Sequence, residues 1–226
     1  MTPSPIRRLV SLAALAVVLA AACTTGGTSA SPDPSVPAPT GSPDAFASCP
    51  TSQPEALPAG ETRIVTIATS LGSIEIALEA DLSPIAAGNF AALASCGFYD
   101  GVVFHRVVPG FVIQGGDGEF GKLSTYDRNR AGTGGPGYQI EDEPVTAIYG
   151  RGTVAMARTS APNSVGSQFF IVLDDGARAA LESFNTYQII GSVTSGMETA
   201  DAIAAAADAE IPSNPIEMTD VSVTKP

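Results

Sequence analysis

The chain has 226 residues, of which 44% are hydrophobic, and it contains 23 glycines and 18 prolines. This length and composition suit one sizeable globular domain with appended segments, and leave room for little more. A surplus of acidic residues gives a formal net charge of -12 at pH 7, which argues against nucleic acid as a partner.

Residues 1–22 have the pattern of a secretory signal peptide. A basic start at Arg7 and Arg8 is followed by an apolar run too short to span a membrane, and alanines stand directly before Cys23. Small residues that end at a cysteine resemble a bacterial lipobox, which implies cleavage before Cys23 and a lipid anchor on its thiol. We therefore expect an exported protein on the outer face of the cytoplasmic membrane, with its domain extracellular. A soluble secreted protein in which Cys23 is incidental is the alternative.

Residues 23–60 are rich in Pro, Ser, Thr, Ala and Gly and hold too little apolar material for a core, so they are predicted to be a flexible tether. The globular domain is expected over residues 61–226. With Cys23 used for lipid, Cys49 and Cys96 remain as an even pair in an oxidising compartment, and they are predicted to form a disulfide. Two unrelated reduced thiols are the alternative, because a sequence gives no Cα separation.

The domain begins with two β-rich runs within residues 62–79, separated by a turn at Leu71-Gly72. Ser83 and Pro84 suit an N-cap and a first-turn proline, so a helix is predicted over residues 85–94. Many short strands with two helices favour a mainly β fold closed as an antiparallel barrel, since closure removes exposed strand edges. The remaining expected elements are strands within 104–117, 137–143, 152–157, 167–173, 186–193 and 218–223, and a second helix within 196–207.

The stretch FHRVVPGFVIQGGD, residues 104–117, places one arginine between two apolar segments. Its β-branched and aromatic residues predict paired strands joined by a turn at Pro109-Gly110. Burying an always-charged guanidinium is costly unless it is hydrogen-bonded or acts in a cleft, so Arg106 is the first candidate functional residue. A structural ion pair is the alternative role for Arg106.

Four motifs, FHRVVPGFVIQGGD, GTGGPG, AMAR and GSQFF, occur in the order found in cyclophilin-type peptidyl-prolyl cis-trans isomerases. The chain resembles that family over about residues 63–223. The resemblance implies a closed eight-stranded antiparallel β-barrel capped by two α-helices, with the substrate groove on one outer face. It also implies a monomeric enzyme that accelerates rotation of Xaa-Pro bonds in exported polypeptides and assists their folding, without a cofactor or metal.

The chemistry of this reaction accounts for the residue types. Rotation of an amide has a barrier of about 18–20 kcal/mol, because the C–N bond has partial double-bond character. An apolar pocket can grip the proline ring, and a fixed donor can favour the twisted amide. By the resemblance, the catalytic residues are Arg106, Phe111 and Gln114, and the substrate-binding residues are Val112, Ala157, Gln168, Phe170, Phe184 and Tyr187.

The sequence departs from the family pattern at several positions. Arg158 replaces an asparagine common in eukaryotic members, and the segment RTSAPNSVG has a one-residue insertion, so substrate contacts beyond the proline are expected to differ. Tyr187 stands where many relatives have a histidine, and Phe184 is expected to fill the neighbouring apolar wall. The chain has no tryptophan, which predicts weak binding of cyclosporin.

Three competing motifs favour other functions less well. The segment GDGEFGK nearly spells a phosphate-binding loop, but Leu123 replaces the Ser or Thr that would hold magnesium. His105 lacks the nucleophile elbow of a hydrolase and is expected to be a core histidine, hydrogen-bonded within the barrel. The acidic run at residues 141–143 lacks calcium-loop spacing and is expected to be a solvated turn. A proline-recognising binding or chaperone module with incidental turnover remains the second hypothesis.

Overall fold

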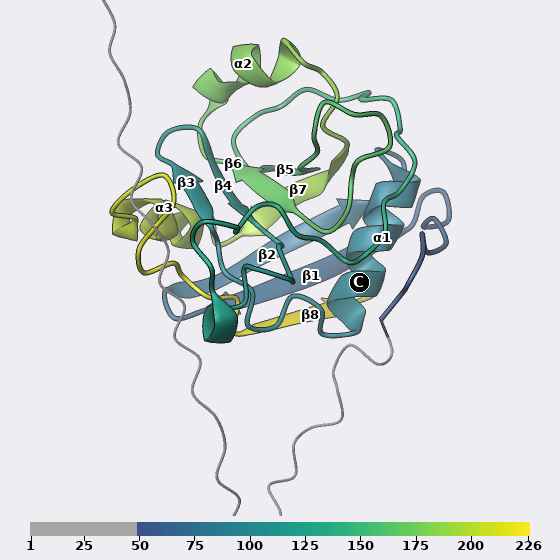
Figure 1. The fold of residues 1–226 in the computed structure, drawn as a ribbon. Coiled ribbons are helices and arrows are strands. Elements are labelled where there is room, and N and C mark those ends of the chain that lie inside the picture. The colour runs from purple at the N-terminus through teal and green to yellow at the C-terminus, as the bar shows by residue number, and fades with distance from the viewer. Residues whose placement is uncertain (1–48) are drawn as a thin grey trace, which may run out of the picture. The chain divides into compact units, whose positions relative to one another are not determined.

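The computed structural model describes residues 49–226, coloured by position in Figure 1. The predicted signal peptide, the lipid site at Cys23 and most of the predicted tether lie outside the described residues. Within residues 49–226, no helix is long and apolar enough to cross a membrane.

Eight strands, three α-helices and two 3-10 turns make up the described domain. In chain order they are β1 Thr62–Thr69, β2 Gly72–Glu79, α1 Pro84–Ser95, β3 Arg106–Val108, β4 Val112–Gly115, η1 Leu123–Thr125, β5 Thr153–Met156, β6 Phe169–Val172, η2 Asp175–Ala177, α2 Arg178–Glu182, β7 Ile189–Ser195, α3 Met197–Ala206 and β8 Asp220–Thr224.

The strands form one antiparallel sheet in the order β3-β4-β6-β5-β7-β2-β1-β8. The mainly β prediction is confirmed, but the predicted closure is wrong, because the end strands β3 and β8 do not pair and the sheet is an open half-barrel (Figure 1). The loop between α3 and β8 covers the edge instead: Val107 N donates to Glu210 O at 2.8 Å, and Phe104 N to Ile216 O at 2.9 Å. With its edge N–H groups bonded in this way, β3 needs no partner strand.

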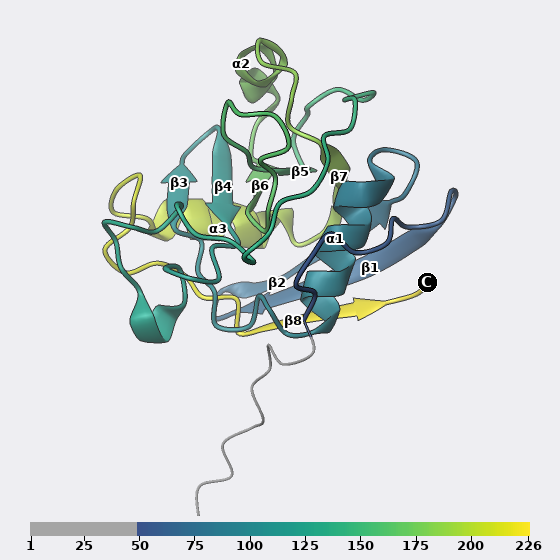
Figure 2. The ribbon, with the colours of Figure 1, turned by 45° about the vertical axis from the view of Figure 1, so that its right-hand side comes forward.

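One face of the sheet carries the main hydrophobic core. In β2 the buried side chains of Ile74, Ile76 and Leu78 alternate with exposed or partly exposed positions, as a half-buried strand requires. They belong to the same hydrophobic cluster as the fully buried Phe90 and Leu93 of α1. Figures 1 and 2 show α1 beside β1, β2 and β8, whereas α3 contacts β2, β3 and β4.

The first predicted helix is confirmed as α1, but its N-terminus is held differently. Ser83 occupies the N-cap position, yet its side chain makes no capping hydrogen bond. Glu143 accepts the N–H groups of Ile85 and Ala86 instead, at 2.8 and 2.9 Å. A carboxylate there also interacts favourably with the helix dipole. The acidic run is therefore a packing element, and the prediction of a solvated turn was wrong for Glu143.

Three smaller predictions also differ from the structure. The first hairpin turns at residues 70–71, one position earlier than expected, since Thr69 pairs with Gly72. The strand predicted within 137–143 is only an isolated bridge between Ile140 and Val165. The segment 174–185, for which the sequence predicted no helix or strand, contains the short helix α2.

Cys49 and Cys96 form the predicted disulfide, with their Cα atoms 5.2 Å apart. It joins the first described residues to the end of α1. Leu57 is buried, and its N–H donates to Pro84 O at 3.0 Å. Gln53 accepts a hydrogen bond from Glu141 N at 2.9 Å. Residues 49–57 of the expected tether thus contact the domain.

Candidate active site

Four neighbouring strands bring the central polar and apolar side chains into one row. Arg106 on β3 pairs with Gln114 on β4, Gln114 pairs with Phe170 on β6, and Phe170 pairs with Ala155 on β5. Residues paired directly across antiparallel strands lie on the same face of a sheet. The row therefore lies on one face of the sheet. The alternate residues Ile113, Phe169 and Ile171 point to the opposite face, into the main core.

An apolar patch surrounds this row. Val112 and Phe170 are buried in a second hydrophobic cluster, against which Phe111, Ala157 and Tyr187 are partly buried. The rings of Phe170 and Tyr187 meet edge to face, with centroids 5.4 Å apart. The patch is a preformed apolar surface that suits a small ring beside Arg106.

Phe184 lies at the margin of the patch. Its side chain is 67% exposed, and its ring centroid lies 6.4 Å from that of Tyr187. The structure thus places Phe184 on the rim, where it forms less of an apolar wall than expected.

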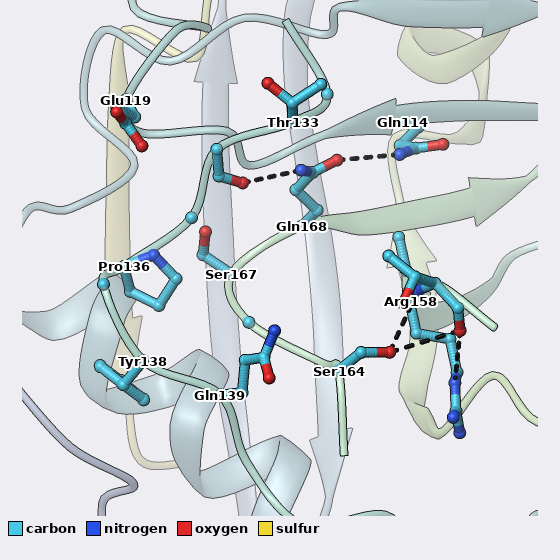
Figure 3. Close-up of a pocket in the computed structure, with 17 residues that line it drawn as sticks. Gln114, Glu119, Thr133, Pro136, Tyr138, Gln139, Arg158, Ser164, Ser167 and Gln168 are labelled. Atoms are coloured by element: carbon cyan, nitrogen blue, oxygen red, sulfur yellow. Dashed lines mark hydrogen bonds between the residues drawn. The ribbon is translucent and has the colours of Figure 1, made fainter. Parts of the chain in front are cut away.

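Two glutamines connect the row to the glycine-rich loop. Gln114 Nε2 donates to Gln168 Oε1 at 3.0 Å, and Gln168 Nε2 donates to Gly134 O at 2.8 Å (Figure 3). Each amide fixes the next, so both side chains are oriented before any ligand arrives. The unused amide groups can bond to a peptide backbone lying across the row.

A buried carboxylate organises the loop that receives this chain of bonds. Asp117 is fully buried, and its Oδ1 accepts the N–H groups of Glu119 and Phe120 at 3.0 and 2.9 Å. Its Oδ2 accepts those of Gly132 and Gly134 at 2.8 and 2.9 Å. Asp117 was not among the predicted site residues, although an acid directly after a buried strand and two glycines was an available signal.

His105 lies behind the row and is only 2% exposed, so it is a core residue as predicted. The predicted hydrogen bond is not made with good geometry: neither ring nitrogen has such a partner among residues 49–226, although the neighbouring Gln168 side chain favours the protonated ring. Burial lowers the pKa of His105 from its ordinary 6.5 to about 4, although the nearby charge of Asp117 favours the protonated ring. A neutral ring close to Gly132 gives the loop an uncharged support.

Arg106 is less buried than the sequence suggested, since 36% of its side chain is exposed. Its Nε donates to Glu210 Oε1 at 2.8 Å. Within the described part of the chain, its terminal nitrogens make no hydrogen bond, so their four N–H groups can bind a ligand.

Arg158 is tied to the protein. Its side chain is only 9% exposed and lies 3.0 Å from Asp142 Oδ1. It also donates to the carbonyls of Thr159 and Ala161, at 3.1 and 2.7 Å. The guanidinium therefore anchors the segment 158–164. Any altered substrate contact is expected from the backbone of this segment more than from the charge of Arg158.

A cavity of about 720 Å³ opens beside the glutamines, between the glycine-rich loop and the segment that follows β5 (Figure 3). Gln114, Gln168 and Ala157 border it on the sheet side, and Thr133 and Glu119 border it on the loop side. No group of three metal-ligating side chains occurs among residues 49–226. The site thus combines an apolar patch, a cation, oriented amides and a polar cavity.

The family model described as cyclophilin type peptidyl-prolyl cis-trans isomerase/CLD matches residues 64–223. A probable peptidyl-prolyl cis-trans isomerase of Brucella suis biovar 1 (strain 1330) is 41% identical over 145 residues, which cover 62% of this chain and 70% of the relative. Peptidyl-prolyl cis-trans isomerase A of Dickeya dadantii (strain 3937) is 36% identical over 169 residues, covering 71% of this chain and 84% of the relative.

Solved structures show the same similarity. A crystal structure of a Cryptosporidium parvum cyclophilin type peptidyl-prolyl cis-trans isomerase matches with a TM-score of 0.60 and 29% identity, covering 73% of this chain and 99% of the other. A second structure of that protein, in the presence of the dipeptide Ala-Pro, has a TM-score of 0.57 at 29% identity and covers 72% and 99%.

Proposed function

This chain belongs to the cyclophilin-type peptidyl-prolyl cis-trans isomerase family, and we propose that it accelerates rotation of Xaa-Pro bonds in exported polypeptides, with Arg106 as the catalytic group. The observation that carries the catalytic assignment is the row of Arg106, Gln114 and Phe170 across three paired strands. It puts a cation with free donors next to an apolar patch, on a rigid sheet.

The geometry suits the reaction without a nucleophile or metal. The proline ring packs on Phe111, Val112 and Phe170, with Tyr187 as the neighbouring wall. As the amide twists, its nitrogen becomes pyramidal, and the nitrogen lone pair, no longer delocalised into the carbonyl, can accept a guanidinium N–H. A donor held in place before the reaction favours the twisted amide over the planar one, which lowers the barrier.

The oriented amides hold the rest of the substrate. Gln114 and Gln168 are fixed to each other and to Gly134, so they can bond to the substrate backbone at little entropic cost. Ala157 borders both the apolar patch and the cavity and is assigned to the residue before proline. The Ala-Pro dipeptide used with the Cryptosporidium parvum relative supports proline-containing peptides as the substrate class.

An isomerisation assay on a short proline peptide tests this assignment. Arg106→Ala should lower kcat/KM by about 100- to 1000-fold, the usual effect of removing a preorganised donor. Arg106→Lys should restore little, since an ammonium lacks the planar fork of donors. Arg63→Ala is the matched control, because Arg63 lies on β1, away from the row.

An inactive parent, or an undiminished Arg106→Ala variant, would refute catalysis by Arg106. Peptide binding that survives Arg106→Ala, in a parent with negligible turnover, would instead favour a proline-recognising binding or chaperone module.

We also propose export and a lipid anchor at Cys23, supported by the basic, apolar and small-residue pattern of residues 1–22. The disulfide between Cys49 and Cys96 is compatible with an oxidising compartment. Fatty-acid labelling of the parent and of Cys23→Ala tests the anchor: the variant should lose the label and pass into the medium. Equal release of an unlabelled parent would favour the soluble secreted alternative.

A further inference from the structure

The catalytic arginine has a carboxylate partner from a distant part of the chain. Glu210 Oε1 accepts the Nε–H of Arg106 at 2.8 Å, across a separation of 104 residues. Both side chains are partly exposed, at 36% and 61%, and exposed ion pairs of this kind stabilise a fold only slightly. The contact is therefore expected to affect the position of the guanidinium more than the stability of the fold.

The main chain fixes Glu210 beside β3. Its carbonyl accepts Val107 N at 2.8 Å, so Glu210 is attached to the residue next to Arg106. Asp208 accepts the N–H of Ser213 at 2.9 Å, which closes the turn that contains Glu210. The main chain at Glu210 is therefore fixed next to Arg106, the residue that the Glu210 side chain contacts.

The segment 118–137 holds the same loop from the other side. Arg128 donates to Ile211 O through both Nε and Nη2, at 3.0 and 2.7 Å. Tyr126 Oη lies 3.4 Å from Pro212 O and donates to it. Figure 2 shows this teal segment, marked by its 3-10 turn, near the yellow loop before β8. Its contacts fall on the two residues directly after Glu210.

We propose that Glu210 is a positioning residue for Arg106, and that Arg128 keeps Glu210 in place. This inference rests on the proposed catalytic role of Arg106. A bond at Nε restricts the rotamers of a long side chain while it leaves the terminal nitrogens free for the substrate. The carboxylate also lowers the positive potential at the site, but solvent screens that opposing effect because both groups are exposed. Orientation is therefore expected to outweigh charge.

Steady-state kinetics of Glu210 variants test the proposal. Glu210→Ala should lower kcat about 5- to 10-fold with little change in KM, because a misplaced donor weakens transition-state stabilisation more than binding. Glu210→Gln should stay within about 2-fold of the parent, since its amide oxygen can still accept the Nε–H. Asp201→Ala is the matched control: it removes a 2.6 Å ion pair with Arg151 of similar exposure away from the row, and should leave the rate unchanged.

A double-mutant cycle tests the part played by Arg128. Arg128→Ala should lower kcat about 2- to 5-fold, and the double variant with Glu210→Ala should be no slower than Glu210→Ala alone. Losses that multiply would overturn the link between Arg128 and Glu210. An unchanged or faster Glu210→Ala variant would overturn the positioning role.

A signal from Arg106 itself separates this inference from the proposed function. The ¹⁵Nε–¹H resonance of Arg106, identified by its absence in Arg106→Lys, should exchange faster with water in Glu210→Ala and in Arg128→Ala. If the parent is inactive but the resonance responds in this way, the proposed function fails and the positioning contact stands. If the parent is active and the resonance does not respond, the positioning role is refuted alone.

Discussion

Asp117→Asn changes one atom of a buried group and should disturb both stability and activity. The carboxylate accepts four backbone N–H groups, two on each oxygen, at 2.8 to 3.0 Å. An asparagine oxygen can keep two of these bonds, but its NH₂ group then faces two donors. Hydrogen bonds to charged groups contribute about 1.5–3 kcal/mol each, so we expect the free energy of unfolding to fall by about 3–5 kcal/mol.

The loss of activity should exceed what unfolding explains. Gly134 is one of the residues held by Asp117, and its carbonyl accepts the amide of Gln168. A displaced loop leaves Gln168, and through it Gln114, free to rotate. In the absence of denaturant, where Asp117→Asn is folded, its kcat/KM should be about 10-fold lower than that of the parent.

Urea unfolding followed by far-UV circular dichroism measures the stability change, since the chain has no tryptophan for fluorescence. Asp127→Asn is the matched control in the same segment: its Oδ1 accepts the exposed N–H of Asn129 at 3.0 Å, and the variant should lose less than about 1 kcal/mol. A loss for Asp117→Asn as small as that of the control would show that water satisfies the loop N–H groups and would refute the organising role of Asp117.

Three further predictions concern pH, covalent linkage and the apolar patch. The folded chain keeps His105 neutral down to about pH 4, whereas the unfolded chain binds a proton near pH 6.5, so the free energy of unfolding should fall by about 3 kcal/mol as pH drops through this window. His105→Gln should lose that part of the pH dependence in parallel urea titrations, and an unchanged dependence would contradict the reasoning. The disulfide between Cys49 and Cys96 spans 47 residues, so replacing both cysteines by serine should lower the free energy of unfolding by about 2–4 kcal/mol. Free thiols detected by alkylation of the non-reduced parent protein would show that the bond does not form. In the isomerisation assay, Phe111→Ala should lower kcat/KM more than about 10-fold. Phe184→Ala should lower it less than about 3-fold, because the Phe184 side chain is 67% exposed, and the reverse order would place the proline ring nearer the rim.

Local patterns in the sequence were sufficient for much of the fold. The alternation of Ile74, Ile76 and Leu78 marks β2, and the turn residues Pro109-Gly110 separate β3 from β4. Once those two strands pair around the turn, the register that brings Arg106 opposite Gln114 follows. Period-two patterning and turn chemistry act over a few residues, so they can be read without a structure.

Contacts between distant segments could not be read in the same way. Ser83 has the right identity for a helix cap, but Glu143, more than 50 residues away, takes the N–H groups. The burial of Asp117 depends on residues up to 17 positions further along the chain, which fold back over it. Short-range propensity does not show which remote group will bond to a given N–H or carboxylate. Tertiary contacts therefore decide both the N-terminal cap of α1 and the burial of Asp117.

The failed prediction of a closed barrel and the partner of Arg106 have one physical origin. Closure was expected because an open β edge leaves N–H groups unpaired. The loop after α3 satisfies that requirement at Val107 with a backbone carbonyl, and the residue that supplies the carbonyl is Glu210. The same residue extends its carboxylate to Arg106, one position away on β3. We therefore expect that shortening the loop between α3 and β8 would weaken both the edge of the sheet and the orientation of Arg106, whereas Glu210→Ala, which keeps the backbone carbonyl, would weaken the orientation alone.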